Sequence, residues 1–344
     1  MGLHDEIRQQ PMVARRLLDE GRPAIERIAD AIRGRFETVV IAARGTSDHA
    51  ALYAQYVFGA RQRVPVALAT PSLLSLYGVE PDFRRTLVIG ISQSGASPDV
   101  VGVVAAARRQ GAPTIAITNT RGSPLARAAE HAVDLAVGPE EAVAATKTYT
   151  AELLALAMLS AALDRDAAAF GALDAVPDAM AAALETEPAV EAATRARPAM
   201  TVCVVLGRGY EYATAREWGL KLKELARVIA DPYSAADFQH GPLALVEPGF
   251  PVLAVAPSGP PAAGVLELLA TLRDDHGADL VVISDRADAL ELADSGLPLP
   301  TGVADWLMPM VSIVPGQLFA LHLARARGLD PELPRHIRKV TLTR

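Results

Sequence analysis

The sequence lacks the cysteines of a disulfide-stabilised protein. It has one cysteine in 344 residues, Cys203, within the apolar stretch of residues 201–206. A single cysteine forms no disulfide within its own chain, and such a sequence fits a reducing compartment. We therefore expect a cytoplasmic protein.

Positive charge is not in excess. The chain has 33 Lys and Arg against 40 Asp and Glu, which gives a formal net charge of -7 at pH 7. No net positive field is available to attract the phosphates of nucleic acids or anionic lipids. We expect neither nucleic acid nor a membrane surface as a partner.

Long uninterrupted apolar segments are also missing. The N-terminal residues MGLHDEIRQQ carry two acids and have no apolar core of a secretory signal. The longest uncharged run of interest, residues 306–324, is interrupted by Pro309 and Pro315. We interpret this run as a buried strand, a turn and a helix, not as a membrane span.

Apolar residues are abundant overall. Hydrophobic residues make up 51% of the chain and charged residues 21%, with a mean hydropathy of +0.21. Such a chain can bury enough apolar surface to offset its conformational entropy, so most of it is folded. Its length predicts about two domains.

The apolar pattern predicts an α/β fold. Short runs rich in Val and Ile alternate with longer Ala- and Leu-rich stretches, which is typical of parallel strands joined by crossover helices. We expect helices at 146–163 and 317–327, and strands at 38–43, 66–69, 86–92, 114–118, 131–136, 201–206, 228–230, 252–256, 280–284 and 304–307.

The two series of strands look like a repeat. Gly45 and Gly209 are 209 - 45 = 164 residues apart, and Gly95 and Gly259 are 259 - 95 = 164 residues apart. Equal spacing of similar loops indicates a duplication. The Ala- and Glu-rich segment between the copies, residues 164–198, reads as a helical linker.

Two loops of the first copy are candidates for binding an anion. Residues 92–99, SQSGASPD, follow a predicted strand and precede a predicted helix, and Gly45-Thr46-Ser47 is placed in the same way. Hydroxyls and backbone N–H groups at a helix N-terminus favour an anion. The simpler interpretation is a serine- and glycine-rich turn with an ordinary helix cap.

Nucleotide and metal sites are not indicated. Gly207-Arg208-Gly209 lacks the third glycine of the dinucleotide fingerprint, and no loop carries Gly-Lys-Ser or Gly-Lys-Thr. The seven histidines show no metal-ligand spacing with each other or with the cysteine, so we expect no metal.

One predicted helix carries a charged stripe. Glu217, Lys221 and Glu224 are spaced i, i+4 and i+7, which places two acids and a lysine on one face, and His240 follows in a turn next to Gly241. The stripe is either a solvated row of salt bridges or a proton-transfer group. Spacing alone leaves both open.

Seven motifs resemble, in order, the isomerase half of glucosamine-6-phosphate synthase, a double sugar-isomerase (SIS) family. They are ARGTSDHA, SQSGASPD, ITNTRGSPLAR, VGPEEAVAATKTYTAE, LGRGYEYATAREWGLKLKE, DFQHGPLALV and PRHIRKVTLT. The resemblance implies two tandem SIS domains, each a parallel sheet flanked by helices in a flavodoxin-like, three-layer αβα fold. It places an N-terminal helical segment at 1–30, domains at 31–165 and 199–328, a helical linker at 166–198 and a tail over the active site at 329–344.

The resemblance also implies roles for particular residues. The family's proton-shuttling glutamate falls on Glu224, its helper lysine on Lys221, its ring-opening histidine on His240 from the neighbouring subunit, and its carbonyl-reaching tail lysine on Lys339. Its phosphate-binding residues fall on Ser47, Ser92, Gln93, Ser94 and Ser97. Its sugar-binding residues fall on Gly45, Thr46, Ala144 and Thr146, beside Lys147, and Arg44 stands where the synthase often has cysteine.

The implied protein is an aldose–ketose isomerase that works as a homodimer with shared sites and needs no cofactor. We expect no amidotransferase domain in this protein, which favours the direction that releases ammonia, from glucosamine 6-phosphate to fructose 6-phosphate. Galactosamine-6-phosphate deamination and deglycation of a fructosyl-amine phosphate remain alternatives within the enzyme class. A non-catalytic sugar-phosphate sensor is the alternative outside it. Retention of Glu224, His240 and Lys339 argues against the sensor.

Overall fold

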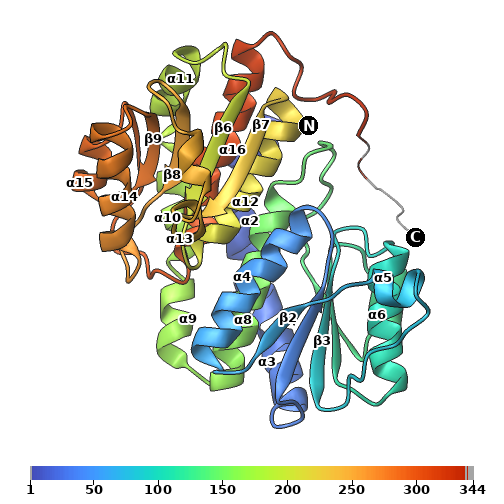
Figure 1. Ribbon diagram of the computed structural model, residues 1–344. Coiled ribbons are helices and arrows are strands. Elements are labelled where there is room, and N and C mark those ends of the chain that lie inside the picture. Colours follow the sequence, from blue (N-terminus) through green and yellow to red (C-terminus); the bar gives the residue numbers. More distant parts are fainter. Residues whose placement is uncertain (1, 338, 340–344) are drawn as a thin grey trace. The chain divides into compact units, whose positions relative to one another are not determined.

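The computed structural model describes residues 2–337 and 339, which fold as two compact units (Figure 1). The first unit contains residues 12–140 and 147–174, together with Lys339. The second unit contains residues 2–11, 141–146 and 175–337. Each unit is built around one parallel sheet.

The sheet of the first unit has five parallel strands in the order β2-β1-β3-β4-β5. The central strands are buried on both faces, as their Val- and Ile-rich sequences predict. Its strands are β1 (Thr38–Ala42), β2 (Val66–Leu68), β3 (Thr86–Ile91), β4 (Thr114–Thr118) and β5 (His131–Asp134). The register pairs Ala42 of β1 with Gly90 of β3, so these two strands end side by side.

Helices cover this sheet in layers. One face packs on α6 (Pro98–Arg109) and α7 (Pro124–Ala128) through Val88, Val104 and Leu125. The helix α8 (Lys147–Asp164) is buried along nearly its whole length and packs on α3 and α4. The remaining helices are α2 (Gln10–Arg16), a π-helical turn at Leu17–Gly21, α3 (Arg22–Ile32), α4 (Thr46–Arg61), α5 (Ser72–Ser75) and α9 (Ala167–Leu173).

The second unit repeats the same topology. Its strand order is β10-β9-β8-β6-β7, which is the order of the first sheet one repeat later, so the predicted duplication and α/β class are confirmed. The strands are β6 (Val202–Gly207), β7 (Ile229–Ser234), β8 (Pro251–Val255), β9 (Asp279–Ser284) and β10 (Ser295–Pro298). Its helices are α1 (Leu3–Arg8), α10 (Val176–Leu184), α11 (Glu187–Arg195), α12 (Glu211–Lys221), α13 (Ala235–Phe238), α14 (Ala262–Asp274), α15 (Ala287–Glu291) and α16 (Met308–Ala326).

Two predictions in this unit are wrong. The last strand lies at Ser295–Pro298, not at 304–307. Residues 308–326 form one helix, α16, where the run 306–324 was expected to hold a strand, a turn and a helix; the expected helix at 317–327 is the C-terminal part of α16. Pro309 is in the first turn of α16, where a missing N–H costs nothing. Pro315 lies inside the helix, in a segment that is buried from Met308 to Ala324, and the packing of this segment maintains the helix.

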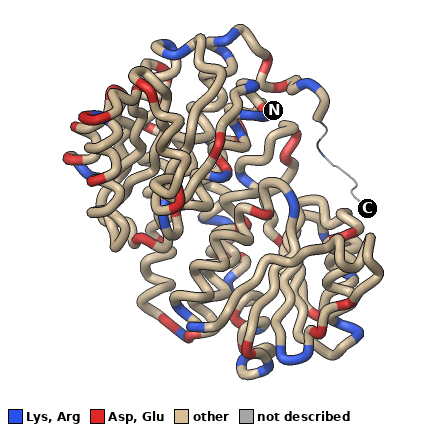
Figure 2. Tube along the Cα trace, in the orientation of Figure 1, with Lys and Arg blue, Asp and Glu red and all other residues tan. Residues whose placement is uncertain are grey.

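One apolar stretch of the described chain is long enough to resemble a membrane-spanning helix. By length and composition alone, the 18 residues Ala167–Leu184, with a mean hydropathy of 1.3, could span a membrane, and 44% of them are buried inside the protein. The structure divides this stretch into α9 and α10, separated by the turn at Asp174 and Ala175. Figure 2 shows acidic and basic residues interspersed along the described chain.

Candidate active site

The two candidate anion loops lie at the same edge of the first sheet. One loop follows β1 and leads into α4, and the other follows β3 and leads into α6. Because β1 and β3 are neighbours in parallel register, both loops leave the sheet at its carboxyl edge. The strand order reverses between these two strands, and this is where open α/β sheets bind their ligands.

The serine loop is held in one conformation by Gly95. Its φ is +60°, and a Cβ atom there would lie 2.1 Å from the hydroxyl of Ser123 and 2.9 Å from that of Thr118. The Gly95 N–H donates to the carbonyl and the hydroxyl of Ser92 at 3.1 and 3.2 Å, and its own carbonyl accepts from the N–H of Leu125. Only glycine fits this position, both in backbone conformation and in space.

The other serines of this loop lie at the start of α6. The hydroxyl of Ser94 accepts from the N–H of Ala96 at 3.3 Å, while Ser97 is the N-cap of α6 but makes no side-chain cap bond. Ser92 is buried, and Gln93, Ser94 and Ser97 are partly exposed. The loop therefore presents hydroxyls and a helix N-terminus together, as an anion site requires.

Ser47 is positioned differently from the other serines. It lies in the first turn of α4, after Gly45, whose φ of +56° is in the left-handed region that favours glycine. The Ser47 hydroxyl donates to the buried carboxylate of Glu152 on α8 at 2.8 Å. In this arrangement the hydroxyl proton is directed at Glu152, and only the oxygen is left to accept a bond from a ligand.

Arg44 joins the two loops. Its Nε donates to the buried carboxylate of Asp99, in the first turn of α6, at 2.6 Å, and its guanidinium is about half exposed. The position therefore supplies a cation beside both loops. Arg44 was not predicted as a site residue, although its place directly before Gly45-Thr46-Ser47 was a signal in the sequence.

The tail lysine also reaches the first unit. Lys339 donates through Nζ to the Glu140 carboxylate at 2.8 Å, and Glu140 accepts as well from the N–H and the hydroxyl of Thr148 at 3.0 and 2.9 Å. Glu140 was not predicted. The rest of the predicted tail beyond Lys339 lies outside the described residues, as does residue 338.

The predicted sugar-loop residues belong to the second unit. Ala144 and Thr146 are both buried in the segment 141–146. The carboxylate of Glu6 on α1 supports this segment by accepting from the N–H groups of Glu141 and Ala142 at 2.5 and 3.4 Å. The carbonyl of Thr146 accepts from the side chain of Gln317 on α16.

The charged stripe on α12 is buried. Lys221 Nζ lies 3.2 Å from Glu217 Oε1 and 2.6 Å from Glu224 Oε2, and the side chains of Lys221 and Glu217 have no exposed surface. The Glu224 side chain is 21% exposed and lies in the π-helical turn Leu222–Ala226 that ends the helix. The interpretation as a solvated row of salt bridges is therefore wrong.

Electrostatics keeps this lysine charged. Burial by itself lowers the pKa of Lys221, but the attraction of Glu217 and Glu224 outweighs burial, so the pKa of the ammonium is raised. A charged lysine fixes the position of the Glu224 carboxylate, in a side chain that is itself partly exposed. π-Helical turns such as this one often mark functional sites.

His240 also lies in the second unit. It follows α13 in an exposed turn, where its N–H donates to the carbonyl of Asp237 and Gly241 takes a φ of +127°. Among the residues that the structure describes, the His240 ring makes no hydrogen bond or ion pair with Glu224 or Lys221.

The second repeat does not reproduce the anion site. Glu211 occupies the position of Ser47 one repeat later, and Ser258 and Gly259 correspond to Ser94 and Gly95. Glu211 is 4% exposed, accepts from the Ser312 hydroxyl at 2.7 Å, and lines a small pocket together with the acid Asp305. Burial raises its pKa to about 7. A carboxyl group at this place disfavours a phosphate, so within the described residues the candidate anion loops are those of the first repeat.

Comparison with known proteins agrees with this architecture. The SIS domain family model matches residues 35–162 and 202–327. The glutamine–fructose-6-phosphate aminotransferase (isomerizing) of Methanothermobacter thermautotrophicus is 35% identical over 339 residues, which cover 97% of this chain and 56% of that protein. The chain thus spans about half the length of the curated relatives it matches, namely their isomerase, C-terminal half.

Solved structures of similar length share the fold. A candidate phosphosugar isomerase from Silicibacter pomeroyi DSS-3 is 34% identical with a TM-score of 0.85, covering 96% of this chain and all of that one. Glucosamine-6-phosphate deaminase from Thermotoga maritima has a TM-score of 0.80 at 21% identity, covering 99% of both chains, and shows the same fold. With both repeats matched by the family model, this chain belongs to the SIS domain family.

Proposed function

We propose that this protein is a phosphosugar isomerase that deaminates glucosamine 6-phosphate to fructose 6-phosphate and ammonia. The observation that carries the proposal is the buried Glu217, Lys221 and Glu224 group, in which one carboxylate is partly exposed and held by a charged lysine. A carboxylate held in this way is suited to take a proton from carbon and return it.

The serine loop and Arg44 bind the 6-phosphate in this proposal. Hydroxyls, backbone N–H groups and the N-terminus of α6 stabilise an anion, and the Arg44 guanidinium adds a positive charge. Ser47, predicted from the resemblance as a phosphate ligand, is reassigned here to the sugar. Its own proton is directed at Glu152, so its oxygen can only accept a hydrogen bond, which a sugar hydroxyl can donate. Gly45 and Thr46 complete that side of the site, and Ala144 and Thr146 line the sugar.

Glu224 transfers the proton between C2 and C1. His240 helps to open the ring, and Glu224 removes the C2 proton from the open-chain aldose to form an enol-type intermediate. Return of the proton to C1 gives the imine of the 2-amino sugar. Water adds to this imine and ammonia leaves, so glucosamine 6-phosphate and water become fructose 6-phosphate and ammonia. Lys221 orients the carboxylate, and Lys339 stabilises the developing carbonyl.

The site works between two subunits in this proposal. The exposed turn that carries His240 is free to serve a neighbouring copy of the chain, and the resemblance to the synthase family supports a homodimer. Mixing Glu224→Gln chains with His240→Ala chains should restore activity in the heterodimers. Absence of recovery after verified subunit exchange would contradict a shared site. A cytoplasmic location completes the proposal, in keeping with the single buried cysteine.

A substrate panel tests the reaction. The full chain is incubated with glucosamine 6-phosphate, galactosamine 6-phosphate or a fructosyl-amine phosphate, and free ammonia and fructose 6-phosphate are measured. We expect ammonia from glucosamine 6-phosphate with the wild type and with the matched control Glu267→Gln, whose side chain is exposed on α14. Glu224→Gln should release almost none.

The panel also distinguishes the alternatives. Ammonia from only one of the other two substrates would reassign the substrate but keep the chemistry. Binding of sugar phosphates with neither ammonia release nor isomerisation would contradict the enzyme and identify a sensor.

A further inference from the structure

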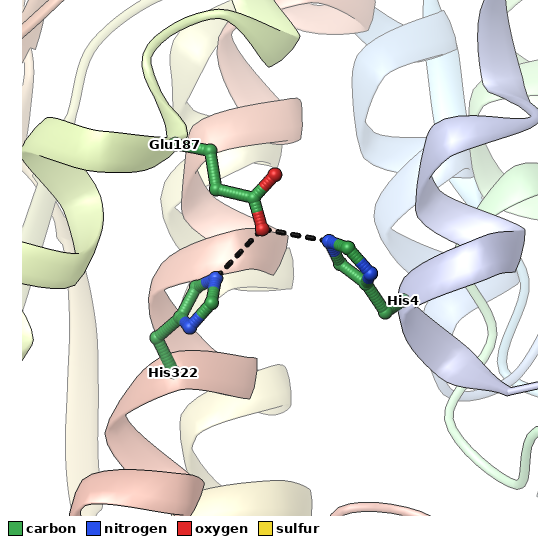
Figure 3. A group of neighbouring side chains, drawn as sticks. All are labelled: His4, Glu187 and His322. Carbon is green, nitrogen blue, oxygen red and sulfur yellow. Dashed lines mark hydrogen bonds and ion pairs between the residues drawn. The ribbon is translucent and has the colours of Figure 1, made fainter.

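Two histidines that are far apart in the sequence meet at one carboxylate in the second unit (Figure 3). His4 is on α1, His322 is on α16, and Glu187 is the first residue of α11. The Nε2 atoms of His4 and His322 lie 2.6 and 2.9 Å from the same oxygen, Glu187 Oε1. All three potential ligand atoms are within 4.8 Å of one another.

We propose that His4, His322 and Glu187 form a Zn²⁺ site that fastens helix α1 to the second unit. Two imidazoles and a carboxylate are a ligand set that zinc takes in three-ligand sites, with a water in the fourth position. Magnesium and calcium prefer oxygen ligands and fit this set poorly.

The distances fit a zinc ion after small side-chain movements. With bonds of about 2.0–2.1 Å, tetrahedral ligand atoms are about 3.3 Å apart. The two nitrogen–oxygen distances of 2.6 and 2.9 Å therefore need to widen by less than about 1 Å. The two nitrogens, which lie within 4.8 Å of each other, need to approach by up to about 1.5 Å. Neither imidazole has to turn toward the carboxylate, because both rings already point at Glu187 (Figure 3).

Neighbouring side chains orient the ligands. Arg8 donates to the second carboxylate oxygen of Glu187 at 2.9 Å, which leaves Oε1 as the oxygen that faces the two rings. Glu191, one turn further along α11, has a carboxylate oxygen 3.9 Å from His322 Nδ1. In the structure the Nε2 atoms of both rings lie at hydrogen-bond distance from Glu187 Oε1, so zinc binding releases the protons from these nitrogens.

The cluster is accessible to an ion from solvent. The side chains of His4, Glu187 and His322 are 31%, 15% and 9% exposed. A surface cavity of about 290 Å³ adjoins the Glu187 carboxylate and gives an ion a route to it from solvent. It is lined by Arg8, Leu184, Glu185, Glu187, Pro188 and Glu191.

The ion would act on the segment of the candidate sugar loop. Helix α1 carries both His4 and Glu6, and Glu6 holds the N–H groups of Glu141 and Ala142. Fastening α1 through His4 therefore steadies the segment that carries Ala144 and Thr146. This is a structural role, separate from proton transfer.

Zinc binding to the full chain tests the site. The protein is freed of metal by dialysis against a chelator and titrated with ZnCl₂ alone, by calorimetry and by competition with a chromophoric chelator. We expect one ion per chain and a rise in Tm on adding zinc. His4→Ala should weaken binding by at least about 10-fold and abolish the rise in Tm.

Matched variants keep the result unambiguous. His276→Ala, which changes a partly exposed histidine outside the cluster, should bind zinc as the wild type does. Glu187→Gln removes the carboxylate ligand and should weaken zinc binding. His4 is the most exposed of the three ligands, so His4→Ala keeps the test valid even if variants of the buried His322 fail to fold. No zinc binding by the wild type, or unchanged binding by His4→Ala and Glu187→Gln, would overturn the proposal.

Discussion

Replacing Glu211 by glutamine should stabilise the protein at neutral and alkaline pH. Glu211 is 4% exposed, and its Oε1 atom has no hydrogen-bond partner in the described part of the chain. Burial raises its pKa from an ordinary 4.5 to about 7, although hydrogen bonds from Thr214 and Ser312 lower it. Glutamine has nearly the same shape, and its oxygen can still accept from the Ser312 hydroxyl.

The magnitude follows from the pKa. A rise from 4.5 to about 7 means that the folded protein binds this proton more tightly than the unfolded chain does, by about 3 kcal/mol. Below pH 4.5 the carboxyl group is protonated in both states and costs nothing extra. Between pH 4.5 and 7 the unfolded chain loses the proton first, so the free energy of unfolding falls as the pH rises, and it levels off above pH 7.

Tryptophan fluorescence provides the assay. Both tryptophans, Trp218 and Trp306, are buried in the second unit, where Glu211 also lies, so their emission reports the unfolding of this unit in urea. We expect Glu211→Gln to match the wild type near pH 4.5 and to exceed it by up to about 3 kcal/mol at pH 8. Glu267→Gln, on an exposed face, should follow the wild type throughout. Parallel profiles of wild type and Glu211→Gln would refute the reasoning.

Three further predictions concern the candidate site. Gly95→Ala should raise KM for the sugar phosphate and lower Tm. The added Cβ would lie 2.1 Å from the Ser123 hydroxyl, and a left-handed φ costs alanine about 1–2 kcal/mol. The control Gly102→Ala, with open space around it inside α6, should change neither KM nor Tm. Lys221→Met should lower the free energy of unfolding in urea by about 3–5 kcal/mol, because it leaves a buried carboxylate without its lysine. A decrease under about 1 kcal/mol, the size expected for an exposed pair, would contradict the burial of this group. Lys339→Ala should leave Tm nearly unchanged but remove most of kcat, and an unaltered kcat would exclude the tail from the reaction.

Much of the fold was predictable because the pattern is repeated. The 164-residue spacing of the glycine loops predicted a duplicated sheet, and both sheets have the same strand order. The same spacing applied to β5, His131–Asp134, gives 295–298, which is where β10 lies. The strand was nevertheless placed at 304–307, because Ser-Gly-Leu-Pro lacks the β-branched residues that mark strands. It is an edge strand, which pairs only with β9 and tolerates such residues.

The N-terminal part of helix α16 escaped prediction for a different reason, whereas its C-terminal part was predicted as a helix at 317–327. From Met308 to Ala324 it is buried on every side, so no polar face gives it the helical period that sequence analysis looks for. Pro315 and Gly316, two residues that disfavour helices, lie inside this segment. Gly316 allows close packing of Trp218, whose ring would lie 3.2 Å from a Cβ atom added at this position. Packing, not local propensity, determines the helix there.

The candidate site was predictable only in its local parts. Spacing correctly placed Glu217, Lys221 and Glu224 on one face, but spacing does not say whether that face is buried. The bonds from Ser47 to Glu152 and from Lys339 to Glu140 join residues that are 105 and 199 positions apart. No local pattern encodes such pairs, because the fold alone brings them together.

Hydrogen exchange at C2 of the substrate tests most directly whether Glu224 moves the proton. The protein is incubated with glucosamine 6-phosphate in D₂O, and incorporation of deuterium at C2 is followed by NMR. Glu224→Gln preserves the shape of the side chain but removes the base, so kcat should fall on the order of 100-fold or more and exchange should disappear with it. Glu267→Gln should exchange at the wild-type rate. Exchange retained in Glu224→Gln would contradict the account and move the base elsewhere, with Glu217 the next candidate.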